Sequence, residues 1–287
     1  MTTTIEDRIS ANYADLSTKL RTAADYIAAN PVDVATRSLR SVAQTSGVSP
    51  ATFSRLARVL GFEGYEALRE AGRAAVGQRL VPFADRAEAL RRGDQSSAHF
   101  LHRQAGACVQ NIDLLEQSIS TDQLSEAVDA LHGAERVLLI GALGSAGIVD
   151  YFAYQAQFFA RDWSVAGRSG ASIAASYARM APGDVVIVLT KRPYSGQSMR
   201  ALRAAQANSF KTIVLTDSHA SPALRDADFR FVVPSETANF FSSYVATLVL
   251  METMMSMLVS RVGEEAEARI RATEDQTRIL SENWGET

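Results

Sequence analysis

Residues 38–62 read SLRSVAQTSGVSPATFSRLARVLGF and decide the fold of the N-terminal part of the chain. Ser38 is suited to cap a first helix, and Ser49 followed by Pro50 is suited to begin a second one. Gly47 stands where the chain must leave the first helix and turn, a position open to glycine because it lacks a Cβ. The stretch therefore predicts two short helices joined by a tight turn.

The second of these helices divides its side chains between an inner and an outer side. Apolar residues recur at helical spacing and are expected to pack inward: Val48, Phe53, Leu56 and Leu60. In a helix-turn-helix, the N-terminal part of the second helix faces base edges in the major groove. The residues left outside are the candidate DNA contacts: Ser49, Ala51, Thr52, Ser54, Arg55 and Arg58.

Arg55 and Arg58 have different expected roles in such an interface. Arg55 is placed to reach a guanine edge and Arg58 to hold a phosphate. The competing interpretation is an ordinary helical hairpin packed at a surface. Charge favours DNA, because residues 37–79 hold seven arginines against three glutamates, whereas residues 81–287 hold 19 basic and 24 acidic residues.

Composition narrows the function classes for the whole chain. Its 287 residues, 47% of them hydrophobic, are enough for two domains with cores of their own. No charged-then-apolar segment opens the sequence, so a cytoplasmic location is expected. The single cysteine, Cys108, excludes an internal disulfide and any multi-cysteine zinc site. The four histidines do not cluster with carboxylates at ligand spacing, so we expect neither a metal nor a cofactor.

One apolar run, residues 240–259, has the length of a membrane span. It contains Glu252 and several hydroxyl residues, which favour instead an interior helix packed between a sheet and a partner subunit. We therefore expect no membrane contact.

From residue 136 the sequence changes to short runs of β-branched and apolar residues without clean alternation. Such runs are typical of strands buried on both faces of a parallel sheet. The runs are RVLLI, DVVIVLT, KTIVLTD and FRFVVP, with a further short strand near Trp163 to Ala166. Helices are expected between them over residues 145–161, 170–180, 197–208 and 239–262, after two earlier helices over 97–118 and 121–132. This series predicts an open α/β domain of three layers.

Small and polar residues follow the carboxyl ends of neighbouring strands, where ligands bind in such sheets. Backbone N–H groups, hydroxyls and a helix N-terminus there are suited to an anion, and Lys191 and Arg192 add positive charge. The alternative is that small residues stand at these turns only for packing. The candidate effector contacts at the two turns are Gly141, Gly144, Ser145, Thr190, Lys191, Arg192, Ser195 and Ser198.

Several segments together resemble the MurR/RpiR family of bacterial transcriptional regulators. The block SPATFSRLARVLGFEGY resembles the family's N-terminal helix-turn-helix domain, and RVLLIGALGSAG, GDVVIVLTKRPYS, IVLTDSHASPAL and FFSSYVATLVLMETM resemble its SIS (sugar isomerase) domain. The resemblance implies an all-α domain over residues 1–80, a linker over 81–96, and an α/β SIS domain over 97–287 with a five-stranded, flavodoxin-like parallel sheet. It also implies operator DNA as a partner, a small effector that is often a sugar phosphate, and homodimers or homotetramers joined through the SIS domains.

The sequence departs from the SIS pattern at two turns. Leu143 stands in place of the second glycine of a Gly-x-Gly-x-Ser loop, and the second loop, TKRPYSGQS, is longer than the usual Ser-x-Ser-Gly-x-Thr. Glu236 lies near the place of the catalytic glutamate of SIS isomerases, and is either a ligand contact or a plain surface residue. We expect a ligand-responsive regulator without catalytic residues; the alternative is a sugar-phosphate isomerase, for which Glu236 and His219 form the only available acid–base pair.

Overall fold

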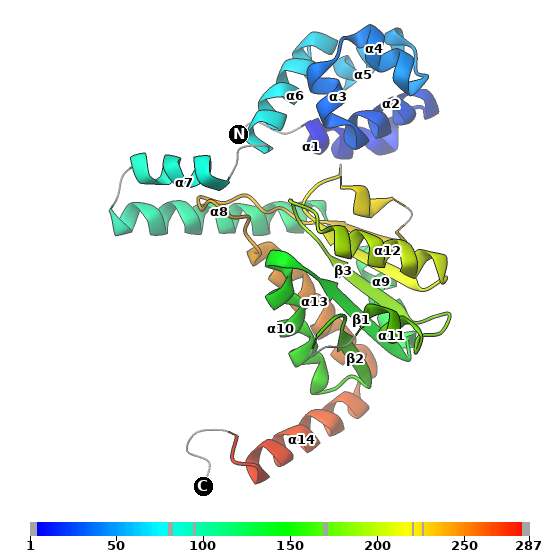
Figure 1. Cartoon of the computed structure of the whole chain (residues 1–287), viewed down its shortest axis with the longest axis vertical. Helices are drawn as coiled ribbons and strands as arrows, with labels where there is room; N and C mark the ends of the chain where they lie inside the picture. The colour runs from blue at the N-terminus through cyan, green and yellow to red at the C-terminus, as the bar shows by residue number, and fades with distance from the viewer. Residues whose placement is uncertain are drawn as a thin grey trace. The chain divides into compact units, whose positions relative to one another are not determined.

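The computed structural model describes residues 5–79, 83–93, 96–168, 172–219, 221–225 and 227–282 (Figure 1). The chain forms two compact units, one drawn mainly from residues 1–95 and the other mainly from residue 96 onward. Helix α7 (Phe83–Arg92) falls in the segment expected to link the two domains, and it buries no residue.

The N-terminal unit is a cluster of helices around Phe53. The rings of Tyr26 and Tyr65 meet the fully buried Phe53 ring edge-on, with centroids 6.0 Å and 6.1 Å away. The elements are α1 (Ile5–Asn12), the 3-10 helix η1 (Tyr13–Asp15), α2 (Thr18–Ala29), α3 (Pro31–Thr36), α4 (Leu39–Ser46), α5 (Pro50–Val59) and α6 (Tyr65–Arg79). The predicted pair of short helices is thus α4 and α5, and Leu56 and Leu60 are buried as expected, while Val48 packs at the edge of the core.

Arg8 of α1 closes the C-terminal end of α5. Its Nη1 donates to the carbonyl oxygens of Leu60 at 2.9 Å and Gly61 at 3.2 Å, and its guanidinium lies 4.5 Å from the centre of the Phe62 ring. The last carbonyls of a helix have no partner inside the helix, so a cation placed there both bonds them and complements the helix dipole. Residues 52 positions apart in sequence thereby fix the end of α5.

The C-terminal unit is an α/β domain of three layers built on a parallel sheet of order β2-β1-β3-β4-β5. This is the flavodoxin-like order, and the expected fold class is confirmed. The strands are β1 (Arg136–Gly141), β2 (Asp162–Val165), β3 (Val185–Leu189), β4 (Lys211–Thr216) and β5 (Phe229–Val232). The helices are α8 (Ser97–Ser118), α9 (Thr121–Gly133), η2 (Leu143–Ser145), α10 (Ala146–Gln157), α11 (Ile173–Tyr177), α12 (Gly196–Ala207), η3 (Pro222–Leu224), α13 (Val245–Val262) and α14 (Glu264–Ile279).

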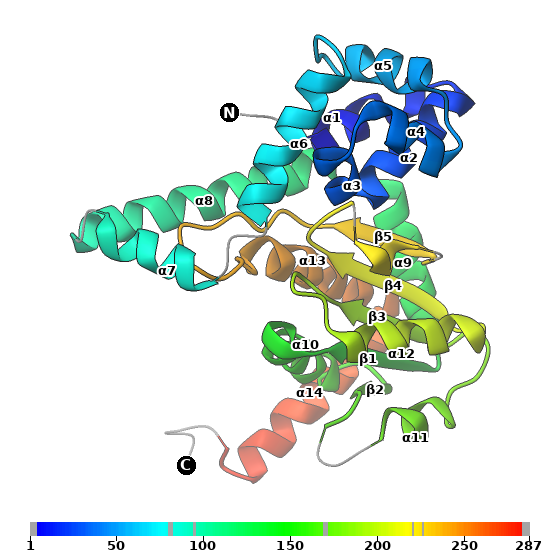
Figure 2. The ribbon, with the colours of Figure 1, turned by 45° about the horizontal axis from the view of Figure 1, so that its top comes forward.

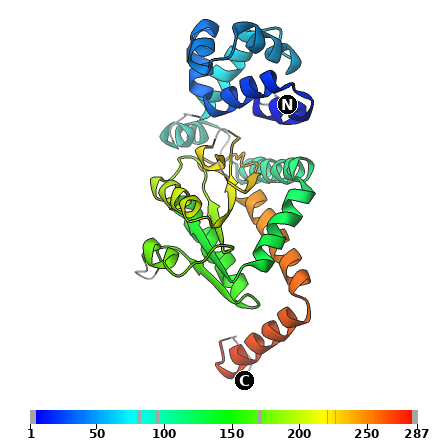
Figure 3. The ribbon, with the colours of Figure 1, turned by 90° about the vertical axis from the view of Figure 1, so that its right-hand side faces the viewer.

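Alternate residues of each strand feed two separate cores, because side chains alternate across a sheet. Val137, Leu139 and Ile187 face α9, α10 and α13, whereas Leu138 and Val186 face α12. In Figure 3 the sheet lies between the yellow-green α12 on one side and the green α9 and orange α13 on the other. Strands covered on both faces explain the continuous apolar runs in the sequence.

Three helices are shorter than the sequence predicts, and one of them, expected over 145–161, spans only Ala146–Gln157. The helix expected over 239–262 begins only at Val245, because the backbone before it is committed elsewhere: the Ser243 N–H donates to the Ser235 carbonyl at 3.1 Å, and the Ser243 carbonyl accepts from Lys191 at 2.8 Å. The helix expected over 170–180 is confined to Ile173–Tyr177, and residues 169–171 lie outside the described residues.

Helix α13 is, among the described residues, the one helix long and apolar enough to cross a membrane. It buries Leu250, Met251 and Met254 in the core against the sheet, as expected of an interior helix, while Glu252 and Ser256 are exposed. Figure 2 shows α13 lying along the sheet on the side away from α12. The expected contact of this helix with a partner subunit stays a prediction.

Replacing Arg8 with Ala should lower the free energy of unfolding of the N-terminal unit by about 1–2 kcal/mol, because two hydrogen bonds and a cation–π contact are lost. Urea denaturation of the full chain, followed by circular dichroism, measures the loss. Arg37→Ala is the matched control, since Arg37 makes only a partly exposed ion pair with Asp33 and should change stability by a few tenths of a kcal/mol. Equal losses in the two variants would contradict a capping role for Arg8.

Candidate DNA interface and effector site

The turn between α4 and α5 has the geometry that the sequence predicts. The Ser38 and Ser49 hydroxyls accept hydrogen bonds from the N–H groups of Ser41 and Thr52, each at 3.3 Å, so each caps its helix. Gly47 ends α4 at φ +69°, in the left-handed region that favours glycine. Pro50 occupies the first turn of α5, where a missing N–H costs nothing.

The outer side of α5 presents mainly its two arginines. Arg55 and Arg58 are exposed, as is Ala51, and within the part of the chain that the structure describes neither guanidinium is held by an acidic side chain. Thr52 and Ser54 are half-buried, and the Thr52 hydroxyl lies 2.8 Å from that of Ser49. Four of the six candidate DNA contacts thus have small side chains. The two arginines are the long side chains among the six that can donate hydrogen bonds.

The turn after β1 brings its backbone unusually close to the sheet. A Cβ on Gly141 would lie 2.7 Å from the Ser145 carbonyl and 2.8 Å from the Val149 side chain, so only glycine fits there. Leu143 has φ +54° and is 68% exposed. The leucine that replaces the pattern's glycine therefore adopts a left-handed backbone, at a cost of about 1–2 kcal/mol. Gly144 is exposed beside it.

Ser145 faces inward from this turn and meets a residue that the sequence did not single out. Its side chain is buried, and its Oγ lies 3.0 Å from the Tyr244 hydroxyl. Tyr244 comes from the segment just before α13. Burial raises the pKa of the Tyr244 phenol, although the hydrogen bond to Ser145 opposes this, so the phenol stays protonated near neutral pH.

The turn after β3 buries a lysine. Lys191 is 5% exposed; its Nζ donates to the Ser243 carbonyl at 2.8 Å and lies 4.5 Å from the centre of the Tyr244 ring. Burial lowers the pKa of Lys191 to about 7, against the opposing effect of the Asp217 carboxylate. The lysine whose positive charge was expected at this turn is therefore buried inside the protein.

Asp217, which follows β4, accepts hydrogen bonds from the other residues of the turn after β3. Its carboxylate accepts from the Arg192 backbone N–H at 3.3 Å, from Arg192 Nε at 3.0 Å and from the Tyr194 hydroxyl at 3.2 Å. The side chain is 2% exposed. Arg192, which the sequence assigned to a ligand, is thus already engaged by an internal carboxylate, and so is Tyr194, which it did not assign.

The remaining candidates lie around the start of α12 and beyond β5. Ser195 caps α12 by accepting from the Ser198 N–H at 3.4 Å, and Thr190 is buried at the end of β3. The Ser198 Oγ is fully buried without a hydrogen-bond partner among the described residues, beside a helix N-terminus. Glu236 instead engages Asn111 through its backbone, and its side chain is exposed, as is His219.

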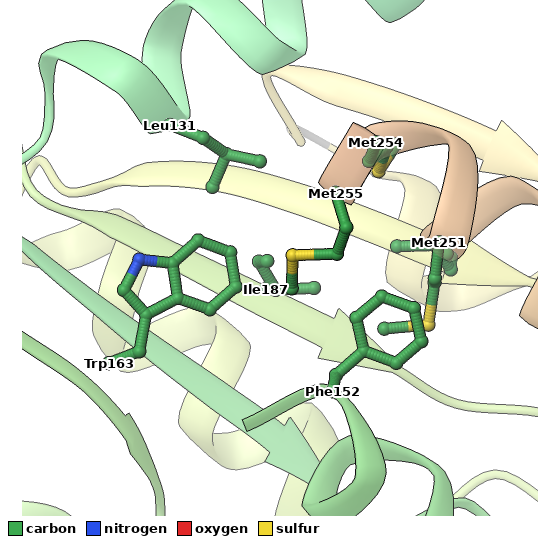
Figure 4. A pocket seen from close by; sticks show the side chains of 8 residues that line it. Leu131, Phe152, Trp163, Ile187, Met251, Met254 and Met255 are labelled. Atoms are coloured by element: carbon green, nitrogen blue, oxygen red, sulfur yellow. The ribbon is translucent and has the colours of Figure 1, made fainter. Parts of the chain in front are cut away.

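No metal site appears among the described residues. No group of three or more His, Cys, Asp or Glu side chains there is placed to hold a metal ion. A void of about 10 Å³ lies inside the core, bounded by Leu131, Phe152, Trp163 and Met255 among others (Figure 4). Its apolar walls offer no hydrogen-bond partners, and it has room for about one water molecule, so it is a packing defect rather than a binding site.

Comparison with known proteins matches both units. Residues 3–74 match the family model of the rpiR-family helix-turn-helix domain, and residues 130–257 match that of the SIS domain. The chain is 24% identical over 262 residues to a helix-turn-helix-type transcriptional regulator of Caldanaerobacter subterraneus subsp. tengcongensis, and 23% identical over 274 residues to one of Haemophilus influenzae. Each alignment covers 90% of this chain and 90% of the relative.

Solved structures share the fold. The NanR protein of Vibrio vulnificus, in complex with ManNAc-6P, is 21% identical with a TM-score of 0.55, over 96% of this chain and 99% of that one. The sugar isomerase domain of an RpiR transcription factor from Sphaerobacter thermophilus is 21% identical with a TM-score of 0.57, over 63% of this chain and 99% of that one.

The buried Lys191 should make stability depend on pH. In the unfolded chain its amine has an ordinary pKa of about 10.4, above the folded value of about 7. Between these values the unfolded state binds more protons, so the free energy of unfolding should rise as pH increases from about 7 to about 10. The cost of burying the charge is present in full below about pH 7.

Lys191→Met should remove that rise, because methionine is neutral at every pH. Urea denaturation at about pH 6 and about pH 9 measures the difference in slope between the variant and the parent chain. Lys211→Met is the control, since the Lys211 ammonium is largely exposed beside Asp228. If parent and Lys191→Met chains show the same pH dependence, the lysine is not buried in solution.

Proposed function

Because the chain belongs to the rpiR family of helix-turn-helix transcriptional regulators with a SIS domain, we propose that it binds operator DNA through α5 and senses a small anionic metabolite, a sugar phosphate, at the carboxyl ends of β1 and β3. It is proposed to act in the cytoplasm, without catalytic activity of its own. Ligand binding changes operator affinity because the two arrangements of the regulator bind the ligand unequally.

The observation that supports DNA binding most directly is the pair of exposed arginines on α5. An arginine without an acidic partner keeps all its donors for base edges and phosphates. Small neighbours such as Ala51 permit the helix to approach the groove closely. A homodimer or homotetramer would offer two such helices to half-sites spaced by about one turn of DNA, 34–36 Å, or a multiple of it.

The effector site is supported by its hydroxyl groups. Ser145 and Tyr244 share one hydrogen bond at the turn after β1, and the Ser198 hydroxyl is buried at the N-terminus of α12 without a partner among the described residues. A buried hydroxyl without a partner is unfavourable unless a ligand or water supplies the hydrogen bond, and the helix dipole favours an anion. The relative from Vibrio vulnificus was solved with ManNAc-6P, a phosphosugar.

Replacing the two arginines should separate base reading from backbone binding. Arg55→Ala should relax sequence preference at one operator position, worth about 1–3 kcal/mol, whereas Arg58→Ala should weaken all sequences alike and reduce the salt dependence by about one phosphate contact. Binding-site selection followed by fluorescence anisotropy at several salt concentrations measures both effects. Arg37→Ala, an arginine of the same unit paired with Asp33, serves as the control. If the Arg55→Ala variant keeps the sequence specificity of the parent chain, Arg55 does not read a base.

Ser198→Ala provides a sharp test of the effector site. Because this hydroxyl has no partner among the described residues, its loss should not lower the melting temperature of the free protein. A phosphosugar that binds the parent chain should bind the variant about tenfold more weakly or worse. Thermal shift and calorimetry with ManNAc-6P, hexose 6-phosphates and uncharged polyols give the readout, with Thr253→Ala on the outer side of α13 as control. A polyol hit without a phosphosugar hit would overturn the anionic ligand class.

A further inference from the structure

The segment Ser235–Tyr244, which joins β5 to α13, is held at two places by different parts of the C-terminal unit. We call this segment the strap. It folds back on itself through the hydrogen bond from the Ser243 N–H to the Ser235 carbonyl at 3.1 Å. The first half of the strap is bound by α8, and its last two residues are bound by the proposed effector site.

Two side-chain amides on one face of α8 form hydrogen bonds with the strap. The Asn111 amide is fully buried; its Nδ2 donates to the Glu236 carbonyl at 2.7 Å, and its Oδ1 accepts from the Glu236 N–H at 3.0 Å. Gln104, seven residues earlier, accepts at its Oε1 from the Thr237 hydroxyl and from the Ala238 N–H, both at 3.1 Å. Four hydrogen bonds, three of them to strap backbone, thus fix α8 to this segment.

The other end of the strap closes the effector site. The Ser243 carbonyl is the acceptor for the buried Lys191 ammonium, and the Tyr244 hydroxyl bonds Ser145. A ligand that reaches the Ser145 hydroxyl or alters the charge around Lys191 must therefore act on strap residues. The same Ser243 lies against α8, with its Oγ 3.9 Å from Cys108 Sγ.

The first half of α8, as far as the structure describes it, contributes no buried residue to its unit. The buried residues of the helix are Asn111 and Leu115, and both lie in its second half. In the first half, Phe100 and Leu101 are 37% and 72% exposed. A helix that buries little apolar surface opens locally at low free energy, so its polar contacts decide its position. In the sequence α8 also follows directly after the linker from the DNA-binding domain.

We propose that the strap transmits effector occupancy to α8, with Gln104 and Asn111 as the positioning residues that convert a shift of Ser243 and Tyr244 into a change in α8. The inference rests on the proposed function in that it takes the Ser145–Tyr244 pair as part of the effector site. Coupling requires a segment that contacts both sites and has two arrangements. The strap contacts both sites, through Gln104 and Asn111 of α8 at one end and through Lys191 and Ser145 at the other.

A double-mutant cycle in the full-length protein tests the proposal by hydrogen–deuterium exchange. Tyr244→Phe removes the hydroxyl that bonds Ser145 and so loosens the site end of the strap without a ligand, while the hydrogen bond from Lys191 to the Ser243 carbonyl remains. Amide exchange should become about fivefold faster in the strap and also in residues 98–112 of α8. In the Asn111→Leu background, Tyr244→Phe should accelerate exchange in the strap alone.

Gln117→Leu is the matched control, because Gln117 is an exposed amide of α8. In that background the effect of Tyr244→Phe on α8 should be unchanged. Should Asn111→Leu fail to fold, Gln104→Leu tests the same coupling, since Gln104 is only half-buried. The proposal is overturned if Tyr244→Phe leaves α8 exchange unaltered in the parent chain, or if the α8 response survives unchanged in both Asn111→Leu and Gln104→Leu.

Adding ManNAc-6P as a probe separates this inference from the proposed function. If ManNAc-6P changes exchange in the strap and in α8 of the parent chain, and only in the strap of Asn111→Leu, both stand. If the probe binds but the mutational coupling is missing, the strap proposal fails alone. If the coupling is present and neither ManNAc-6P nor other phosphosugars bind, the ligand class fails and the strap proposal stands.

Discussion

The C-terminal unit depends on how a buried ammonium group finds its partners. A cation taken out of water is costly unless hydrogen bonds and opposite charge replace its hydration. Lys191 meets this constraint with the Ser243 carbonyl, the face of the Tyr244 ring and the nearby Asp217 carboxylate. These partners come from two other parts of the chain, so the lysine ties the turn after β3 to the end of β4 and to the residues just before α13.

The same constraint explains where sequence reasoning stopped short. Helix α13 begins at Val245 rather than near residue 239 because the Ser243 backbone bonds Lys191 and Ser235 in place of a helical partner. Propensity and periodicity are local signals, and they carry no information about a lysine 52 positions away in the sequence. Asp217 and Tyr244 were missed for the same reason, since each is defined by contacts with distant residues.

Local features, in contrast, were predictable in detail. The caps at Ser38 and Ser49, the left-handed Gly47 and the first-turn Pro50 each depend on a few neighbouring residues, and each is found as predicted. The parallel sheet followed from runs too apolar to have a solvated face, and its five-stranded flavodoxin-like order is confirmed. Leu143 lies between these cases: its departure from a glycine pattern was visible in the sequence, but its left-handed backbone was not.

The carboxylate of Asp217 has a consequence for any anion that approaches the turn after β3. It is a competitor tethered to the protein, and a tethered group acts at an effective concentration of the order of millimolar or more. An anion that takes over the donors of Arg192 and Tyr194 must displace this carboxylate rather than meet free groups. Such an exchange would leave the buried Asp217 carboxylate without these donors, so the affinity for an anion at this turn would be low and the turn would be occupied only when the metabolite accumulates.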